Sequence, residues 1–266
     1  MQGVIPVKAK KKLSFVLIFR NVFVTVFLLG VCAAGAVTLR GYFLYTAALE
    51  DLPPLQAARQ VRDQEGFTPL DQLPDTYLDA VVAAEDHRFY EHNGVDVIAI
   101  GRAVLNDIKS LSLEEGGSTL TQQLAKNLYF TQEKEFTRKI AEVFMAWDLE
   151  SEFSKDEILE LYVNSIYFGS GCYTVGDASR TYFGKEPAKM TDGEATLLAG
   201  IPNAPSVYDL NENPDLARQR QEQVVGLMVK YAGLSQDRAD LILEGSAEYT
   251  PGNPPASQSL SCGTPD

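Results

Sequence analysis

The sequence predicts a mainly α-helical protein, with one membrane-spanning helix near the N-terminus and a helical domain after it. Three observations lead to this prediction. Residues 22–39 form an apolar run without a single charge. Beyond this run, apolar residues recur at helical spacing in several segments, most of which begin with a capping residue or a proline. No alternating pattern of strand length appears, and the sequence contains no internal repeat.

Charge is distributed unevenly along the chain. The protein has 266 residues, and its 45% hydrophobic content is that of a globular protein. Residues 1–40 hold six of the 23 basic residues and no acidic one, which leaves 17 basic against 36 acidic residues beyond Arg40, a balance of −19. Such a domain is repelled by polyanions, so we expect no nucleic-acid partner. The three cysteines, Cys32, Cys172 and Cys262, lack metal-ligand spacing.

The N-terminal region predicts a single anchor. A basic cytoplasmic segment (1–21) precedes the apolar run, and we expect the transmembrane anchor to cover residues 22–45. Because basic residues stay on the cytoplasmic side, everything after Arg40 is expected outside the cytoplasm. A cleaved signal peptide is the alternative, since small residues flank Gly35. The length of the run favours an uncleaved anchor.

Prolines and polar residues divide the rest of the chain. Pro53 and Pro54 are expected to end the first helix, and the polar residues that follow predict a connector over 46–70. We expect the folded domain over residues 71–245. Pro, Gly and Ser dominate afterwards, which predicts a disordered tail over 246–266.

The first helix of this domain is predicted over Asp75–Glu85, and it places an acid on an apolar face. Glu85 falls within the arc set by Tyr77 and Val81. Burial and a helix C-terminus both raise the pKa of a carboxyl group toward the range of a general base. The alternative is a helix that frays before Glu85 and leaves the side chain solvated.

Two further segments carry polar faces of interest. A helix capped by Asp96 and a candidate mobile loop over 106–117 come next. Ser118 and Thr119 can then open a helix on which Thr119, Gln123 and Lys126 share one face. The Gly-Gly-Ser-Thr entry offers free backbone N–H groups there, which favours an anion site over a solvated face.

In the helix predicted over Glu135–Glu150, a stripe of apolar residues is expected to be buried, and Arg138 and Glu142 stand opposite it. They form either an exposed ion pair or the wall of a cleft in which Arg138 and Lys139 meet a phosphate, and spacing leaves both open. The stripe consists of Ile140, Val143, Phe144 and Trp147.

Three more helices follow from caps. Ser154 with Glu157, and Thr191 with Glu194, have capping-box spacing. The first of these helices is expected to run through Ile166 and the second to end at Gly200. A long helix should start at Asn213 and Pro214 and close at Gly233. Its inward positions are expected to be Leu216, Val224, Leu227 and Met228.

Five blocks of sequence stand out in a fixed order. They are EDHRFYEHNGVD (85–96), GGSTLTQQLAKN (116–127), RKIAEVFMAWDLE (138–150), KDEILELYVNSIYFG (155–169) and GEATLLAGIPNAPSVYD (193–209). A shorter block, TYFGK at 181–185, lies between the fourth and the fifth. With these blocks the chain resembles one family, the peptidoglycan glycosyltransferases of bacterial cell-wall synthesis (biosynthetic transglycosylases, glycosyltransferase family 51).

The resemblance implies a lysozyme-like, two-lobed domain with a cleft, whose smaller lobe touches the membrane. It implies that Glu85 is the general base and Glu142 the second catalytic carboxylate. The implied substrate is lipid II, a disaccharide-peptide on undecaprenyl pyrophosphate, which is joined to a growing glycan strand. The positions that match sugar or pyrophosphate contacts are Asp86, Ser118, Thr119, Gln123, Lys126, Arg138 and Lys139.

The same resemblance frames partners and alternatives. Family members often work with Mg²⁺ or another divalent cation, but no ligand cluster in the sequence marks a metal site. Wall-synthesis or division proteins are expected partners, at the bacterial cytoplasmic (inner) membrane. The chain lacks a transpeptidase module, which predicts a monofunctional enzyme.

The alternatives are a lytic enzyme on the same fold and a non-catalytic scaffold. Thr174 and Ser179 depart from the family pattern and put substrate fit in question.

Overall fold

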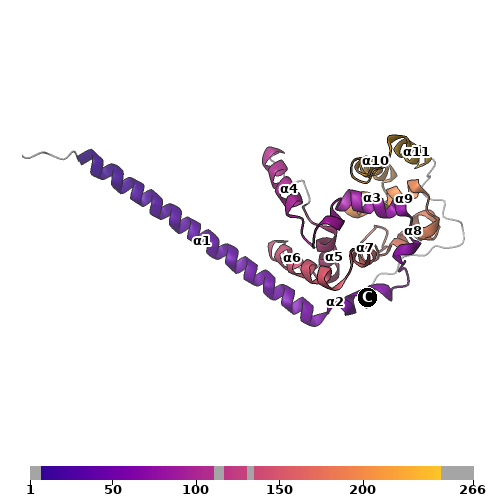
Figure 1. Ribbon diagram of the computed structural model, residues 1–266, viewed down its shortest axis with the longest axis horizontal. Coiled ribbons are helices and arrows are strands. Elements are labelled where there is room, and N and C mark those ends of the chain that lie inside the picture. The colour runs from indigo at the N-terminus through magenta and orange to yellow at the C-terminus, as the bar shows by residue number, and fades with distance from the viewer. Residues whose placement is uncertain (1–6, 111–116, 131–134, 247–266) are drawn as a thin grey trace, which may run out of the picture.

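The computed structural model describes residues 7–110, 117–130 and 135–246, and every regular element in these ranges is helical. The mainly α prediction is therefore confirmed, and the predicted tail lies almost wholly outside the described residues. Figure 1 shows one long helix leading into a compact group of shorter ones. The helices are α1 (Val7–Asp51), α2 (Pro54–Arg62), α3 (Asp75–Glu85), α4 (Val97–Ser110), α5 (Leu120–Tyr129), α6 (Glu135–Glu152), α7 (Lys155–Val163), α8 (Val175–Phe183), α9 (Asp192–Gly200), α10 (Pro214–Tyr231) and α11 (Gln236–Ser246).

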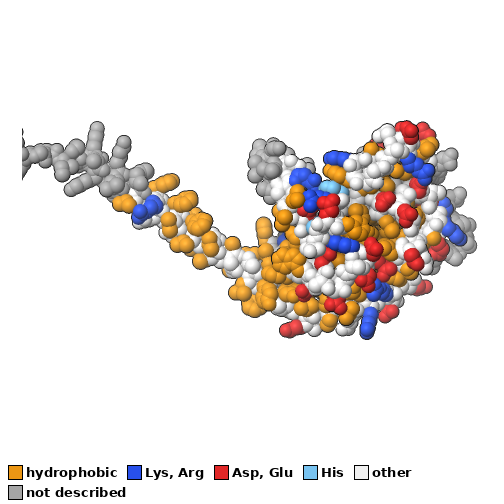
Figure 2. Space-filling model, viewed as in Figure 1, with side chains coloured by type: hydrophobic (Ala, Val, Ile, Leu, Met, Phe, Trp, Pro, Cys, Tyr) orange, Lys and Arg blue, Asp and Glu red, His pale blue; other side chains and the backbone are white. Residues whose placement is uncertain are grey.

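Helix α1 is long and apolar enough to cross a membrane over Leu17–Asp51. Its apolar side chains stand exposed along most of its length, as Figure 2 shows. Exposure on this scale is unusual for a soluble protein, and it agrees with a membrane-anchored chain. The helix continues without interruption past the predicted end of the anchor at residue 45 and stops at Asp51, just before the two prolines.

The last turns of α1 pack on α6 of the domain. Gly41 is buried there, and a Cβ atom at this position would lie only 2.5 Å from the Cβ of Ile140. Tyr42 meets the edge of the Phe144 ring, with centroids 5.4 Å apart, and the Tyr45 hydroxyl donates to the Asp148 carboxylate at 2.5 Å. The end of the anchor is therefore part of the folded domain.

Packing against α1 also corrects the predicted stripe of α6. The core-facing residues of α6 are Ala141, Met145 and Leu149, while Trp147 is 50% exposed. Helix α1 covers Ile140 and Phe144, so the apolar face counted from the sequence serves the anchor and not the core.

Two segments of the domain differ from the predictions near its start. The expected connector contains α2, whose Ala57, Ala58 and Val61 are buried in the core, so the folded domain begins near Pro54 rather than Asp71. Helix α4 extends through Ser110, into the segment expected to be a loop; residues 111–116 of that loop lie outside the described residues.

Helix α4 also leaves apolar residues uncovered. Its cap is as predicted, since Asp96 accepts hydrogen bonds from the N–H groups of Ile98 and Ala99. Val97 is nevertheless 75% exposed, and Ile98 is exposed as well. Figure 1 shows why, because α4 projects away from the packed helices.

The remaining helices surround the core that carries α3. Helix α3 packs against α9 and α10, and α5 packs against α6 and α7. The two predicted capping boxes are present at the starts of α7 and α9. Helix α7 ends at Val163, three residues earlier than expected. In α10 Val224 and Met228 are buried as predicted, but Leu216 is exposed. Helix α11, which was not predicted from the sequence, packs against both α9 and α10.

Candidate active site

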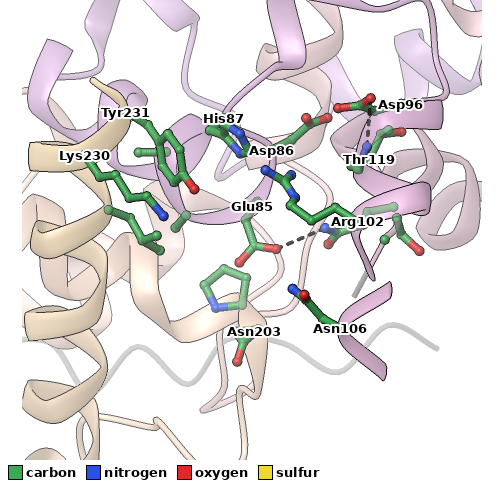
Figure 3. A pocket seen from close by; sticks show the side chains of 18 of the residues that line it. Glu85, Asp86, His87, Asp96, Arg102, Asn106, Thr119, Asn203, Lys230 and Tyr231 are labelled. Atoms are coloured by element: carbon green, nitrogen blue, oxygen red, sulfur yellow. Dashed lines mark hydrogen bonds between the residues drawn. The ribbon is translucent and has the colours of Figure 1, made fainter. Parts of the chain in front are cut away.

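A cleft of about 680 Å³ opens between α3 and α10 on one side and α4 and α5 on the other. Its volume suits a ligand of substantial size. Six of the sequence-predicted site residues line it: Glu85, Asp86, Ser118, Thr119, Gln123 and Lys126. Figure 3 shows Glu85 near the centre of the lining residues. The others on its walls include His87, Arg102, Asn106, Asn203, Arg220, Lys230 and Tyr231.

Glu85 is the last residue of α3, and its side chain is only 8% exposed. Gln123 donates a hydrogen bond of 3.0 Å to its Oε2. Its Oε1 accepts no hydrogen bond from the described residues and faces Arg220 at 3.8 Å. Burial raises the pKa of Glu85, the bond from Gln123 and the charge of Arg220 oppose the rise, and Asp86 adds to it. A carboxylate with one oxygen held and the other available can accept a proton in the cleft.

Asp86 and Thr119 line the cleft while holding its walls together. The Oδ2 atom of Asp86 accepts from the backbone N–H of Leu120 at 3.1 Å and contacts Nε2 of His92 at 2.9 Å. Thr119 caps α5 in a capping box with Gln122 and donates to the Gly94 carbonyl at 2.6 Å. These bonds tie the start of α5 to the turn that follows Glu85.

The other three predicted residues form a cluster on α6 that does not line the cleft. Glu142 is fully buried, and its two oxygens face Arg138 Nε at 3.0 Å and Lys139 Nζ at 2.6 Å. The exposed ion pair considered from spacing is therefore wrong. Lys139 also donates to the hydroxyl of Ser118 at 2.8 Å, and Ser118 does line the cleft. The cluster thus reaches the cleft wall through one hydrogen bond.

Three cations in the cleft were not among the predicted residues: Arg102, Arg220 and Lys230. Arg220 and Lys230 belong to α10, which lies more than 130 positions along the chain from Glu85. Arg220 and Leu227 are seven residues apart and share one side of that helix, so their spacing could have indicated a cation beside an inward face. Nothing in the sequence indicated that this side meets α3.

A metal ion has no evident ligand set in the described part of the chain. No group of three or more His, Cys, Asp or Glu side chains is placed there to hold one. The partners of Glu142 are two cations, which would repel a metal ion.

Comparison with known proteins matches residues 54–229 to the transglycosylase family. The chain belongs to that family. A candidate transglycosylase of Cupriavidus necator is 42% identical over 194 residues, which cover 73% of this chain and 84% of that protein. Penicillin-binding protein 1A of Neisseria flavescens is 43% identical over 69% of this chain, and penicillin-binding protein 2D of Bacillus subtilis is 44% identical over 70%. The chain spans only 23% and 27% of the lengths of these two relatives.

Within this transglycosylase domain, the two departures from the family pattern have local explanations. Thr174 caps α8 by accepting from the N–H of Asp177, and the buried Ser179 donates to the Lys185 carbonyl at 2.8 Å. Neither residue lines the cleft. Both therefore act on the fold around α8.

Proposed function

We propose that this transglycosylase is a peptidoglycan glycosyltransferase that polymerises lipid II into glycan strands. The observation that carries the proposal is Glu85, a buried carboxylate with an available oxygen in a cleft lined by four cations. A proton acceptor next to a cationic surface suits a reaction in which an alcohol attacks and a pyrophosphate leaves. The family membership and the shared cleft residues support the same assignment.

In the proposed reaction, Glu85 takes the proton from the 4-hydroxyl of the acceptor sugar. The oxygen attacks the anomeric carbon of the growing strand, a new C–O bond forms, and the bond to the pyrophosphate oxygen breaks with its electron pair. The configuration at the anomeric carbon inverts, so no covalent enzyme intermediate is needed. Gln123 holds the other carboxylate oxygen and so orients the base.

The leaving pyrophosphate needs positive charge that is already in place. Lys126 lines the cleft beside Gln123, and Ser118 connects the cleft wall to Lys139 and Arg138 on α6. We assign Glu142 the role of holding these two cations in position. It is then a positioning residue, because its carboxylate is fully buried and paired on both oxygens.

The N-terminal helix α1 indicates where the proposed reaction takes place. Lipid II carries an apolar tail, so an enzyme that uses it must work at a membrane surface. We propose that α1 crosses the bacterial cytoplasmic membrane once and that the catalytic domain lies on the extracytoplasmic side. The basic residues before the apolar run support this orientation.

The test is polymerisation of labelled lipid II by the full chain in detergent, with and without Mg²⁺, and with products resolved by size. We expect glycan strands from the wild type and none above background from Glu85→Gln. Equal product from that variant would refute the role of Glu85. Digestion of isolated cell wall without lipid II would instead indicate a lytic enzyme. Normal wall growth with both Glu85 and Glu142 replaced would indicate a scaffold.

A further inference from the structure

A second, smaller cavity of about 240 Å³ lies directly beside the cleft. The two spaces share three lining residues, Ala83, His87 and Tyr231. The floor of the small cavity is apolar, from Leu78 and Val82 on α3. Through the three shared residues, the small cavity adjoins the cleft that Glu85 lines.

A pair of stacked rings separates the two spaces. The rings of His87 and Tyr231 have centroids 3.9 Å apart and are inclined by 24°. Figure 3 shows them side by side at the edge of the cleft, next to Lys230. The Lys230 ammonium lies 4.7 Å from the centroid of the Tyr231 ring and lines the cleft, not the small cavity. The Tyr231 ring already holds one cation, which shows its suitability for cation–π contact.

The two spaces differ in charge. Four Lys and Arg side chains line the cleft, whereas the described residues that line the small cavity include neither Lys nor Arg. Its one carboxylate is Asp79. Asp75 lies one turn earlier on α3, and Asp156 accepts a hydrogen bond of 3.2 Å from the hydroxyl of Tyr90, which also lines the cavity. The small cavity therefore has a carboxylate and no cation in its described lining, whereas the cleft sets four cations against the carboxylates of Glu85, Asp86 and Asp96.

Two pKa shifts agree with this division. Burial and then the nearby Arg102 lower the pKa of His87, so its ring is neutral at pH 7 and adds no positive charge to the small cavity. Burial and then the charge of Asp75 raise the pKa of Asp79. The charge of a cation bound next to Asp79 would lower this pKa again.

We propose that this cavity is a specificity subsite for a primary ammonium group, namely a side-chain amine in the peptide of the lipid II substrate. Aromatic walls, an apolar floor and one carboxylate form the environment that binds an ammonium group carried on an apolar stem. The proposal rests on the proposed function, because it takes the peptide of the same substrate as the ligand. The negatively charged pyrophosphate would then bind in the cleft, and the positively charged amine in the small cavity beside it.

The experiment compares two lipid II substrates with the full-length protein: one with a free lysine side chain in its peptide, and one with that amine acetylated. For the wild type we expect a KM about five- to tenfold lower for the free amine, with similar kcat. Asp79→Asn should raise the KM of the free-amine substrate toward that of the acetylated one and leave the acetylated substrate unaffected. Asp63→Asn, an exposed carboxylate at the end of α2 that lines neither space, is the matched control.

Equal KM values for the two substrates in the wild type would overturn the subsite. So would a preference for the free amine that Asp79→Asn does not change. Cadaverine, a diamine without peptide, is added in a separate arm; inhibition by it of both substrates alike would show a site for free amines rather than for the peptide. In all these outcomes polymer still forms, whereas failure of the proposed function gives no polymer from either substrate.

Discussion

Glu85 and Glu142 are both buried carboxylates on helices, yet their surroundings differ. Glu85 is the last residue of α3 and lines the cleft. One of its carboxylate oxygens accepts a hydrogen bond of 3.0 Å from Gln123, and the other lies farther from its nearest cation, 3.8 Å from Arg220. Glu142 lies inside α6 with a cation against each oxygen at 3.0 and 2.6 Å. The comparison supports the proposal of Glu85, rather than Glu142, as the base. A buried carboxylate can take up a proton more readily where only one of its oxygens is closely paired.

The largest expected effect is that of Glu85→Gln, which should reduce activity without reducing stability. Glu85→Gln should lower glycan formation by about 10²- to 10⁴-fold. The folded-state pKa of Glu85 is raised, so its contribution to stability is present at low pH and is lost as pH rises through that pKa. At pH 7 the amide should therefore leave the urea midpoint unchanged or higher. A strongly lowered midpoint would mean that Glu85 is structural.

Glu142→Gln should have the opposite effect on stability. It leaves Arg138 and Lys139 without their carboxylate, and breaking a buried pair costs about 3 kcal/mol, less any screening at the half-exposed Lys139. Urea unfolding of the detergent-solubilised protein measures the loss. Glu152→Gln, at the exposed end of the same helix, is the control and should change stability little. If both variants unfold alike, the α6 cluster does not hold the fold.

The pH dependence of kcat/KM tests whether Glu85 acts as the base and whether Arg220 lowers its pKa. Glu85 must be ionised to act as a base, so the rate should fall as pH drops below its pKa. The charge of Arg220 lowers that pKa, and Arg220→Gln should move the acidic limb of the profile to higher pH. Lys230→Gln, which removes another cleft cation, serves for comparison and should leave the limb in place. A limb that does not respond to Arg220 belongs to a different group.

The smallest expected effect concerns the hydrogen bond from Lys139 to Ser118, which joins the α6 cluster to the wall of the cleft. Ser118→Ala removes the acceptor of Lys139 at the cleft wall, and we expect KM for lipid II to rise by a few-fold, up to about tenfold. Ser151→Ala on the exposed side of α6 is the matched control, since among the described residues Ser151 bonds only to the Asp148 carbonyl of its own helix. An unchanged KM would separate the α6 cluster from substrate binding.

Local signals were predictable from the sequence, and long-range ones were not. The end of α3 at Glu85, the cap of α4 at Asp96 and the capping boxes of α7 and α9 depend on residues a few positions apart. These predictions are confirmed because backbone hydrogen bonding is itself local.

The misses depended on distant partners. Trp147 was placed in the core because its spacing fits, but α1 takes that side of α6 and leaves the indole half exposed. Helix α2 looked like a connector because it is short and mostly polar, but three small apolar residues on one face suffice to attach it to the core. Arg220 reaches Glu85 only because α10 packs on α3. The catalytic roles themselves stay predictions until the variants above are measured.

The close fit of Gly41 against Ile140 has a mechanical consequence. Helix α1 is unbroken from Val7 to Asp51, and its last turns pack closely on α6. The helix and the folded domain should therefore move together as one rigid unit. A transmembrane helix tilts when its apolar length exceeds the thickness of the lipid around it. For the proposed lipid II polymerase, such a tilt would swing the opening of the cleft relative to the headgroups. Membrane thickness would then set how deeply the domain sits over its proposed lipid-linked substrate.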